Sequence, residues 1–493
     1  MQLRFLISIA LVHVLSSTAE CQTWTTDLPG IGTFSSPRTS DLNRDGVGDI
    51  VLGAGRAEFQ ACDTAIFALD GATGSLLWHA SARDQIFGSA ALRDINADGI
   101  SDVFIGGRSA ELQAIDGASG KVIWQFRTAQ DFRVDTNNLW FNFYNPQFVT
   151  DQDGDGIADI LVANGGDVLV EAYDENRPPG HLVLVSAATG KLLARAPTPD
   201  GHEMYMSSIV LEDHRDGKSL IVFGTGGETI GGSLYAATLP MILQEDLAGA
   251  QQLASGVKKG FISPPVLADI TQDDILDIVA LSVDGRILAF DGLTLKPLWQ
   301  RQLPNTEAYS SLAVGQFTED HIPDFFASVA NGVWPKLEWN RQAMIDGASG
   351  EIIYTDSLGF YQTSSPIAAD LSGNGKDEIL LSINYQEFDS LQFKYFRNML
   401  VVTGTDFTEP LQIAELFPGS NISSTPWVGD LDENGKLDII YVYGTNDRQT
   451  YTFDGMNVLR LTTDIPVYGK VQWGAYMGSN GDGIYRVAKI RNP

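Results

Sequence analysis

One stretch of sequence recurs along the chain, and its first copy is DLNRDGVGDIVLGAG at residues 41–55. Close copies are DINADGISDVFIGG (94–107), DQDGDGIADILVANG (151–165), DLSGNGKDEILLS (370–382) and DLDENGKLDIIYVYG (430–444). Weaker copies begin at Glu212, Asp269 and Gln316. Successive copies start 47 to 61 residues apart. Eight units of about 56 residues therefore fill nearly the whole chain, which is the repeat length typical of radial β architectures.

Each unit has the same internal order of short β segments. In the first unit, SSPRTSD (35–41) leads into the acidic loop, DIVLGAG (49–55) follows it, and IFALDG (66–71) and SLLWHA (75–80) complete the unit. Four short strands joined by glycine-containing turns form one antiparallel blade, and no stretch has helical periodicity. The sequence predicts an all-β fold, an eight-bladed β-propeller of four-stranded antiparallel blades, as a single domain over residues 22–493.

The N-terminal segment predicts the cellular compartment. Arg4 precedes an apolar run from Phe5 to Leu15, and small polar residues follow it. This pattern is typical of a secretory signal peptide, predicted here as residues 1–21, and the run is shorter than the roughly 20 residues of a transmembrane helix. We therefore expect a secreted or extracytoplasmic protein, in a periplasm or at a cell surface, with no membrane span. The net charge of −30 argues against nucleic acid as a partner.

The acidic loop at the start of each unit has the spacing of a calcium site. Oxygen-bearing side chains occupy positions 1, 3, 5 and 9, and a glycine at position 6, such as Gly46, permits a sharp turn. Hard oxygen donors at this spacing can surround Ca²⁺, although Asp and Asn also cap polar turns without metal. Five such loops in one register favour calcium as the cofactor, and the loops at Glu212, Asp269 and Gln316 are predicted to hold no ion. The predicted ligands are Asp41, Asn43, Asp45, Asp49, Asp94, Asn96, Asp98, Asp102, Asp151, Asp153, Asp155, Asp159, Asp370, Ser372, Asn374, Glu378, Asp430, Asp432, Asn434 and Asp438.

Two family resemblances follow from these residues. The stretch FGSAALRDINADGISDVFIGG (87–107) resembles the FG-GAP and VCBS repeats of integrin α-chain propellers. The stretch ALDGATGSLLW (68–78) resembles the PQQ-like repeats of quinoproteins, in which a tryptophan, here Trp78, docks onto a neighbouring blade. Blade five departs from this pattern, because Leu295 stands where the glycine belongs. Both resemblances imply a β-propeller. Quinoprotein dehydrogenases carry an adjacent cysteine pair that this chain lacks, so we expect no quinone cofactor.

The long connections between strands predict where a ligand binds. In an up-and-down blade the acidic loop and the turn between the third and fourth strands share one face, so the other connections emerge on the opposite face. Those connections vary most in length and carry aromatic and charged side chains, which suit a sugar or a protein partner. The alternative is that the aromatic rings only pack the loops onto the blades. The predicted ligand-face residues are Trp140, Tyr144, Glu171, Arg177, Glu228, Trp334 and Trp339.

The function that these features favour is that of a secreted calcium-binding module for ligand binding or adhesion, with an extracellular protein or glycan as partner. Two alternatives stay open, because propellers host unrelated activities: a carbohydrate-active enzyme such as a polysaccharide lyase, and a cell-envelope assembly scaffold. The chain contains no HExxH, GxSxG or phosphate-loop motif, which argues against an enzyme and leaves no catalytic residue to name.

Overall fold

The structure, a computed structural model, describes most of the chain beyond the predicted signal peptide, which lies outside the described residues. No helix in the described part is long and apolar enough to cross a membrane. The described residues are 22–126, 140–167, 170–171, 173–206, 208–215, 217–334, 336–360, 363–405, 410–413 and 416–486.

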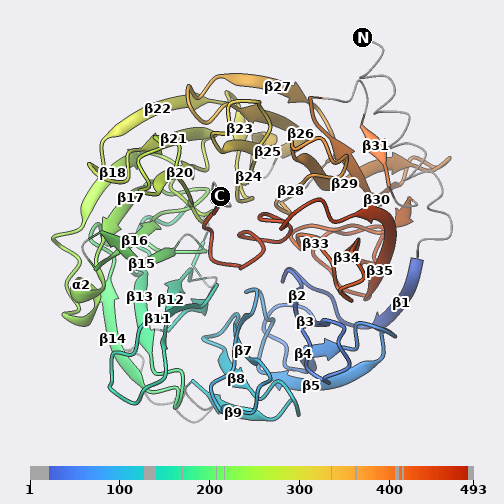
Figure 1. Cartoon of the computed structure of the whole chain (residues 1–493), viewed down its shortest axis with the longest axis horizontal. Coiled ribbons are helices and arrows are strands. Elements are labelled where there is room, and N and C mark those ends of the chain that lie inside the picture. Colours follow the sequence, from blue (N-terminus) through green and yellow to red (C-terminus); the bar gives the residue numbers. More distant parts are fainter. Residues whose placement is uncertain are drawn as a thin grey trace, which may run out of the picture.

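Eight antiparallel sheets stand in a ring around a central axis (Figure 1). This arrangement confirms the predicted all-β, eight-bladed propeller. Blade one contains β2 (Arg38–Ser40), β3 (Asp49–Gly53), β4 (Cys62–Leu69) and β5 (Leu76–Ala82). Blade two contains β6 (Ala91–Arg93), β7 (Asp102–Gly106), β8 (Leu112–Ile115) and β9 (Val122–Gln125). Blade three contains β10 (Asn142–Phe143), β11 (Gln147–Val149), β12 (Asp159–Gly165), β13 (His181–Val185) and β14 (Leu192–Pro197).

The next three blades follow the same order from the axis outward. Blade four contains β15 (Ile209–Arg215), β16 (Lys218–Gly224), β17 (Gly232–Ala237) and β18 (Gln251–Gly256), with the short helix α2 (Leu239–Leu243) before its last strand. Blade five contains β19 (Val266–Ala268), β20 (Asp277–Leu281), β21 (Arg286–Phe290) and β22 (Pro297–Gln302). Blade six contains β23 (Thr306–Glu307), β24 (Ala313–Gly315), β25 (Asp324–Val333), β26 (Lys336–Ile345) and β27 (Ile352–Asp356).

The last two blades close the ring. Blade seven contains β28 (Ile367–Ala369), β29 (Glu378–Phe388), β30 (Lys394–Thr403), β31 (Leu411–Gln412) and β32 (Phe417–Pro418). Blade eight contains β33 (Trp427–Gly429), β34 (Lys436–Gly444) and β35 (Gly455–Pro466), and its outermost strand is β1 (Gln22–Pro29) from the other end of the chain. Because β1 pairs with β35, this blade joins the first and last described strands and closes the ring.

Tryptophan side chains pin neighbouring blades together. The indole Nε1 of Trp24, Trp78, Trp124 and Trp299 donates to a backbone carbonyl in the next blade, at 2.6–2.9 Å. The Trp78 ring also covers Gly120, where an added Cβ would lie 2.5 Å from the Trp78 Cβ. These are the contacts that the tryptophan-docking resemblance implies. Blade four has no tryptophan in β18, so no docked indole excludes a side chain at Leu295 of blade five, which has a positive φ of 56°.

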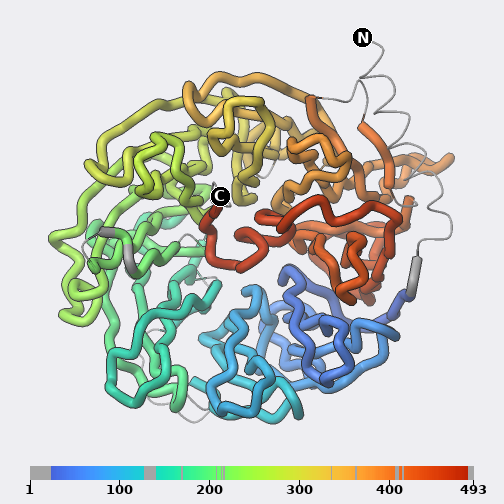
Figure 2. The backbone as a smooth tube through the Cα atoms, in the orientation of Figure 1, coloured from blue at the N-terminus to red at the C-terminus, as the bar shows by residue number. Residues whose placement is uncertain are grey.

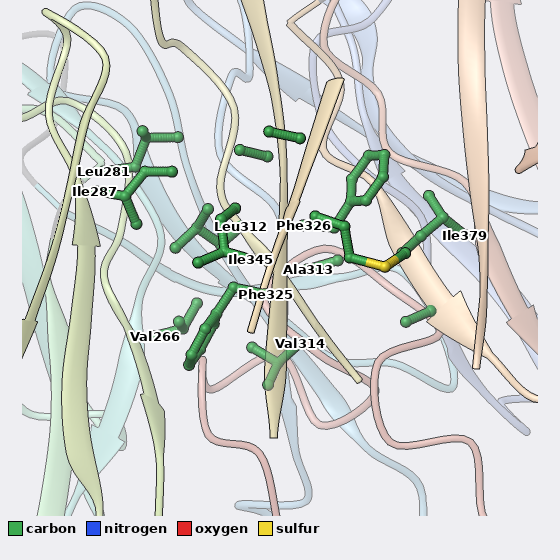
Figure 3. Packing of buried hydrophobic residues seen from close by; sticks show 14 of the residues in the cluster. Val266, Leu281, Ile287, Leu312, Ala313, Val314, Phe325, Phe326, Ile345 and Ile379 are labelled. Carbon is green, nitrogen blue, oxygen red and sulfur yellow. The ribbon is translucent and has the colours of Figure 1, made fainter. Parts of the chain in front are cut away.

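Hydroxyl groups beside the first strands link the blades near the axis. The Ser36 N–H donates to Ser89 Oγ at 3.0 Å, and the Thr425 N–H donates to Ser36 Oγ at 3.0 Å. The second bond connects blade eight to blade one. Between the blades, apolar side chains form continuous cores; Figure 3 shows the one that blades five to seven share, with Val266 and Phe325 fully buried.

The segment after β35 runs into the centre of the ring (Figure 2). Trp473 is buried there and its backbone bridges Ala368, and Ile484 bridges Leu267. The buried Arg38 donates from Nη1 to the Tyr476 carbonyl at 2.8 Å. The C-terminal segment therefore fills part of the central channel and leaves a separate opening at each end.

Candidate functional site

The two ends of the channel differ in the connections that surround them. At one end lie the acidic loops and the turns between third and fourth strands, called here the metal-loop face. The other end is called here the long-loop face. It carries the connections between the second and third strands of each blade and the connections from one blade to the next. A cavity of about 900 Å³ opens on the long-loop face, and all eight blades contribute residues to its wall.

One residue from each blade, at the same place in the repeat, lines this cavity. It lies seven residues before the start of the acidic loop, as Phe34 precedes Asp41. Because the position is equivalent in every blade, the eight side chains surround the axis as a ring, called here the axial ring. Its members are Phe34, Phe87, Tyr144, Tyr205, Ile262, Tyr309, Thr363 and Ser423.

Five aromatic side chains form an unbroken strip along one side of the cavity, called here the aromatic belt: Tyr451, Phe34, Phe87, Tyr144 and Tyr205. The ring centroids of consecutive members lie 6.0, 4.9, 6.4 and 6.0 Å apart. These separations fall within the favourable range for aromatic pairs. The belt gives the cavity a wide apolar wall.

Across the cavity, Tyr173 from blade three lies against Trp334 from blade six, with ring centroids 6.2 Å apart. Tyr173 is 65% exposed and Trp334 is 37% exposed. This pair brings two long connections together at the long-loop face and leaves both rings open to solvent.

Both arginines of the cavity wall are paired with carboxylates of this chain. The Arg108 guanidinium lies 2.7 Å from the Glu58 carboxylate, and the Arg177 guanidinium lies 2.9 Å from the Glu203 carboxylate. Arg177 also donates to the carbonyls of Val170 and Glu171, at 3.2 and 3.0 Å. Burial raises the pKa of Glu203, although Arg177 opposes this shift. Asp167 and Glu228 also line the wall, so the cavity offers fixed polar groups and an excess of negative charge.

The structure separates the predicted ligand-face residues into two sets. Tyr144, Arg177, Glu228 and Trp334 line the cavity. Trp140 is buried, with its ring 5.0 Å from that of Phe126 and under the Arg195 guanidinium at 4.2 Å. That packing is the role that the alternative interpretation gave to these aromatic rings.

The other two predicted residues, Glu171 and Trp339, lie outside the cavity wall. The Glu171 carbonyl holds Arg177, and the Trp339 backbone bridges Phe360. Sequence reasoning missed most of the belt: Phe34, Phe87, Tyr205 and Tyr451. The sequence did contain a signal for Phe34 and Phe87. Each lies seven residues before the start of an acidic loop, a position that is equivalent in every repeat.

Among the metal loops, the one at Asp151 brings its acids together best. Oxygen atoms of Asp151, Asp153 and Asp159 lie within 4.8 Å of one another. Asp151 accepts the backbone N–H of Gly154 at 2.6 Å and of Gly156 at 2.7 Å, and these bonds lower its pKa. An all-oxygen, multiply charged site on a tight glycine turn fits Ca²⁺.

The loop at Asp430 also gathers its acids, but around a side-chain cation. Oxygen atoms of Asp430, Asp432 and Asp438 lie within 4.8 Å of one another. Arg460 on β35 donates from Nη2 to Asp432 at 2.6 Å, and from Nε to Asp438 at 3.0 Å. A guanidinium thus supplies part of the positive charge that calcium would supply in this loop.

The other three predicted calcium loops make the same backbone turn as the Asp151 loop, but their acids are less closely gathered. Asp41 accepts the N–H of Arg44 at 2.6 Å, Asp94 that of Ala97 at 2.7 Å, and Asp370 that of Gly373 at 2.6 Å. Among the described residues, three or more acidic ligand atoms come within 4.8 Å only in the Asp151 and Asp430 loops.

The acid at the ninth position of the loop has a structural role in every well-formed blade. Asp49 accepts the N–H of Leu42 at 2.7 Å and of Gly71 at 2.9 Å, so it ties the acidic loop to the other turn on the same face. Asp277, in a blade predicted to hold no ion, makes the equivalent bonds to Ile270 and Gly292. Burial raises the pKa of Asp49 to about 6. The predicted ligands at this position, which are Asp49, Asp102, Asp159, Glu378 and Asp438, therefore hold the loop whether or not a metal is bound.

Together the blades, docked tryptophans and axial cavity define the class of protein, an eight-bladed β-propeller. Solved structures share this fold. The quinohemoprotein alcohol dehydrogenase of Comamonas testosteroni has 12% identity and a TM-score of 0.57 over 93% of this chain and 78% of its own. A europium-containing methanol dehydrogenase has 11% identity and a TM-score of 0.55 over 89% and 93%. The Bacillus licheniformis rhamnogalacturonan lyase has 14% identity and a TM-score of 0.50 over 94% and 78%. At these identities the likeness concerns the fold alone.

The chain belongs to the FAM234A/B beta-propeller family, whose pattern it matches over residues 24–374. Human protein FAM234B is 22% identical over 419 residues, which cover 76% of this chain and 62% of FAM234B. The chain thus spans about three-fifths of the length of this curated relative.

Proposed function

We propose that this protein is a secreted or extracytoplasmic ligand-binding propeller that takes a glycan in the cavity of the long-loop face. The observation that carries this proposal is the aromatic belt, which forms one continuous wall of a cavity of about 900 Å³. Aromatic faces stack against the apolar faces of sugar rings, and a few polar groups then fix their orientation. The amides of Gln85 and Asn142 and the hydroxyl of Ser423 line the same cavity.

The charge of the cavity supports a neutral ligand over an anionic one. Arg108 and Arg177 are both occupied by carboxylates of this chain. A strongly anionic ligand would have to compete with Glu58 and Glu203 for these guanidinium groups. A ligand that presents hydroxyl groups needs no such exchange.

Calcium is the second part of the proposal. The acidic loops resemble those of FG-GAP and VCBS repeats, and the Asp151 loop offers a set of oxygen atoms that fits the ion. A bound ion would brace the face opposite the cavity, since the loop joins the first two strands of its blade. The N-terminal segment supports an extracytoplasmic location, where calcium is abundant.

A glycan array combined with product analysis tests the function. We expect binding of a defined neutral glycan without turnover. Unsaturated sugar products would indicate a lyase instead, and silence in both assays would favour a protein partner or an assembly scaffold.

Variants locate the site once a glycan binds. Replacing Tyr451 or Trp334 with alanine should weaken binding by about 1–3 kcal/mol, the range for an aromatic anchor. Trp339→Ala is the matched control, because Trp339 is similarly exposed, at 39%, but lies outside the cavity wall. Equal loss in Trp334→Ala and Trp339→Ala would contradict the assignment.

A further inference from the structure

A second cavity, of about 590 Å³, opens at the metal-loop end of the channel. First strands of several blades line it where they approach their acidic loops, together with the C-terminal segment. Its charged lining residues are Arg38, Arg93, Glu212, Asp482 and Arg486. Nothing in the function proposed above uses this cavity.

Arg38 is the decisive group in this cavity. Arg38 is only 9% exposed. Its guanidinium donates from Nε to the Ala90 carbonyl at 3.2 Å and from Nη1 to the Tyr476 carbonyl at 2.8 Å. Among the described residues no carboxylate lies within ion-pair distance of Arg38, and its Nη2 makes no hydrogen bond there. A buried cation without an anionic partner is strongly unfavourable.

The pKa of Arg38 reflects the same situation. Burial lowers it to about 10, and Asp482 opposes this shift only from beyond contact distance. Its side chain is also fitted closely by the backbone, because a Cβ added at Gly481 would lie 2.9 Å from the guanidinium. The fold thus holds a charged group in place without neutralising it.

The remaining charges leave the cavity positive. Arg93 lies over the Phe148 ring at 4.3 Å and has no ion pair within the described part of the chain. Arg486 is paired with Asp482 at 2.7 Å, and Glu212 accepts the backbone N–H of Thr150. Three guanidinium groups therefore face two carboxylates, in a chain whose net charge is −30.

We propose that this cavity binds a small oxyanion, a carboxylate, sulfate or phosphate group, between the buried Arg38 and the exposed Arg93. Guanidinium groups bind such oxygens through paired N–H donors. Ser479 and Asn480 line the same space and can donate further hydrogen bonds. The site is separate from the aromatic cavity, since the C-terminal segment lies between the two openings.

Titration calorimetry and thermal unfolding of the calcium-loaded full chain test this site. The probes are sodium sulfate and sodium glucuronate, with ionic strength held constant by sodium chloride, and glucose is the neutral control. We expect saturable binding of an anion and a rise in melting temperature, with no effect of glucose. Similar affinity for both anions would indicate a site for an inorganic oxyanion, and at least tenfold tighter binding of glucuronate would indicate an organic acid. Either result supports the proposal.

Two variants assign the binding to the named residues. Arg38→Gln should abolish saturable binding, and Arg93→Gln, at an exposed position that tolerates replacement, should weaken it about tenfold even if Arg38→Gln fails to fold. Arg301→Gln on β22 is the control and should change nothing. Absence of saturable binding by sulfate and glucuronate, or binding unchanged in Arg93→Gln, would overturn the proposal.

Discussion

Oδ1 of Asp324 accepts the backbone N–H of Gly347 at 2.9 Å. Oδ2 of the same carboxylate accepts the N–H groups of Phe317 and Thr318, at 3.0 and 2.8 Å. Gly347 has to be a glycine, because a Cβ there would lie 1.9 Å from the Pro323 carbonyl oxygen. The acid thus joins both turns on the metal-loop face of blade six, a blade whose loop lacks the set of calcium ligands. The role of Asp324 is therefore structural.

The first prediction concerns the stability that this carboxylate provides. Asp324→Ala leaves three backbone N–H groups without their acceptor, and we expect a loss of about 3 kcal/mol in the free energy of unfolding, given roughly 1–3 kcal/mol for each unsatisfied buried group and incomplete additivity. Urea unfolding measures this loss. The calcium content should not change. A fall in bound calcium of one ion would show instead that Asp324 is a ligand.

The second prediction is a pH dependence. Burial raises the pKa of Asp324 to about 6 from the ordinary 3.8, so between these values the folded state keeps a proton that the unfolded state has lost. Stability from this group is then greatest below pH 3.8 and declines as the pH rises toward 6. Asp324→Asn should flatten the decline between pH 4 and 6 in unfolding experiments repeated across that range. An unchanged slope would contradict the assignment.

The third prediction separates metal binding from turn formation. Asp155 accepts the Ile157 N–H at 2.8 Å, and Asp320 accepts the Ile322 N–H at 2.9 Å, so both acids make the same bond at the fifth position of their loops. Only the loop of Asp155 also gathers acidic ligand atoms within 4.8 Å of one another, from Asp151, Asp153 and Asp159. Asp155→Ala should therefore lower the calcium stoichiometry by about one, and Asp320→Ala should leave it unchanged. Metal analysis of calcium-dialysed protein measures both, and equal losses would contradict the proposal.

Removal of calcium by a chelator tests how much the same sites stabilise the folded chain. An ion that binds only the folded state stabilises it by mass action, so a chelator should lower the melting temperature of the wild-type chain. The drop should be smaller in Asp155→Ala, because one site is already lost. A melting temperature that does not respond to chelation would refute calcium binding by the folded chain.

The repeat pattern was sufficient to predict the blades, since each acidic loop marks the turn after a first strand and each Asp-Gly pair the turn after a third. The closing strand β1 was not predicted. Its sequence, QTWTTDLP, carries no acidic loop, and only Trp24 indicates an outermost strand. Its partner strand β35 lies more than 400 residues away, and local patterns contain no information about such pairings.

The ligand cavity was predicted less well than the fold. The face with the long connections is one of two faces on which a cavity opens, and Trp334 lines the cavity there. Loop length does not indicate where a side chain points, however, and Trp140 turns into the packing between blades. Phe34 and Phe87 lie seven residues before Asp41 and Asp94 and outside the long insertions, so a search for insertions passes over them. Their common place in the repeat was the better signal.

The fourth prediction tests the contact that pins the blades. Trp78 is 7% exposed and donates to the Gly117 carbonyl at 2.7 Å. Trp78→Ala should lower the free energy of unfolding by about 3–5 kcal/mol, the usual range for truncating a buried tryptophan. Trp339→Ala serves as control, since that ring is exposed and should contribute less than about 1 kcal/mol. Similar losses in the two variants would mean that docking contributes little.

The last prediction concerns the cation in blade eight. Arg460 is 3% exposed and makes hydrogen bonds to Asp432 and Asp438, and also to the Gly71 carbonyl of blade one at 3.1 Å. In the calcium-free protein, Arg460→Gln leaves Asp432 and Asp438 without a compensating charge, which is strongly destabilising for partly buried carboxylates. In the calcium-loaded protein the ion can neutralise them without competition from a guanidinium.

We therefore expect Arg460→Gln to widen the difference in melting temperature between calcium-loaded and calcium-free protein, and to raise the calcium affinity of the Asp430 loop. Thermal unfolding at graded calcium concentrations measures both quantities. The control is Arg301→Gln, whose guanidinium bonds only to backbone carbonyls on the outside of the ring. If Arg460→Gln lowers the melting temperature equally with and without calcium, Arg460 is a structural bridge between blades eight and one and does not share the charge of a metal site.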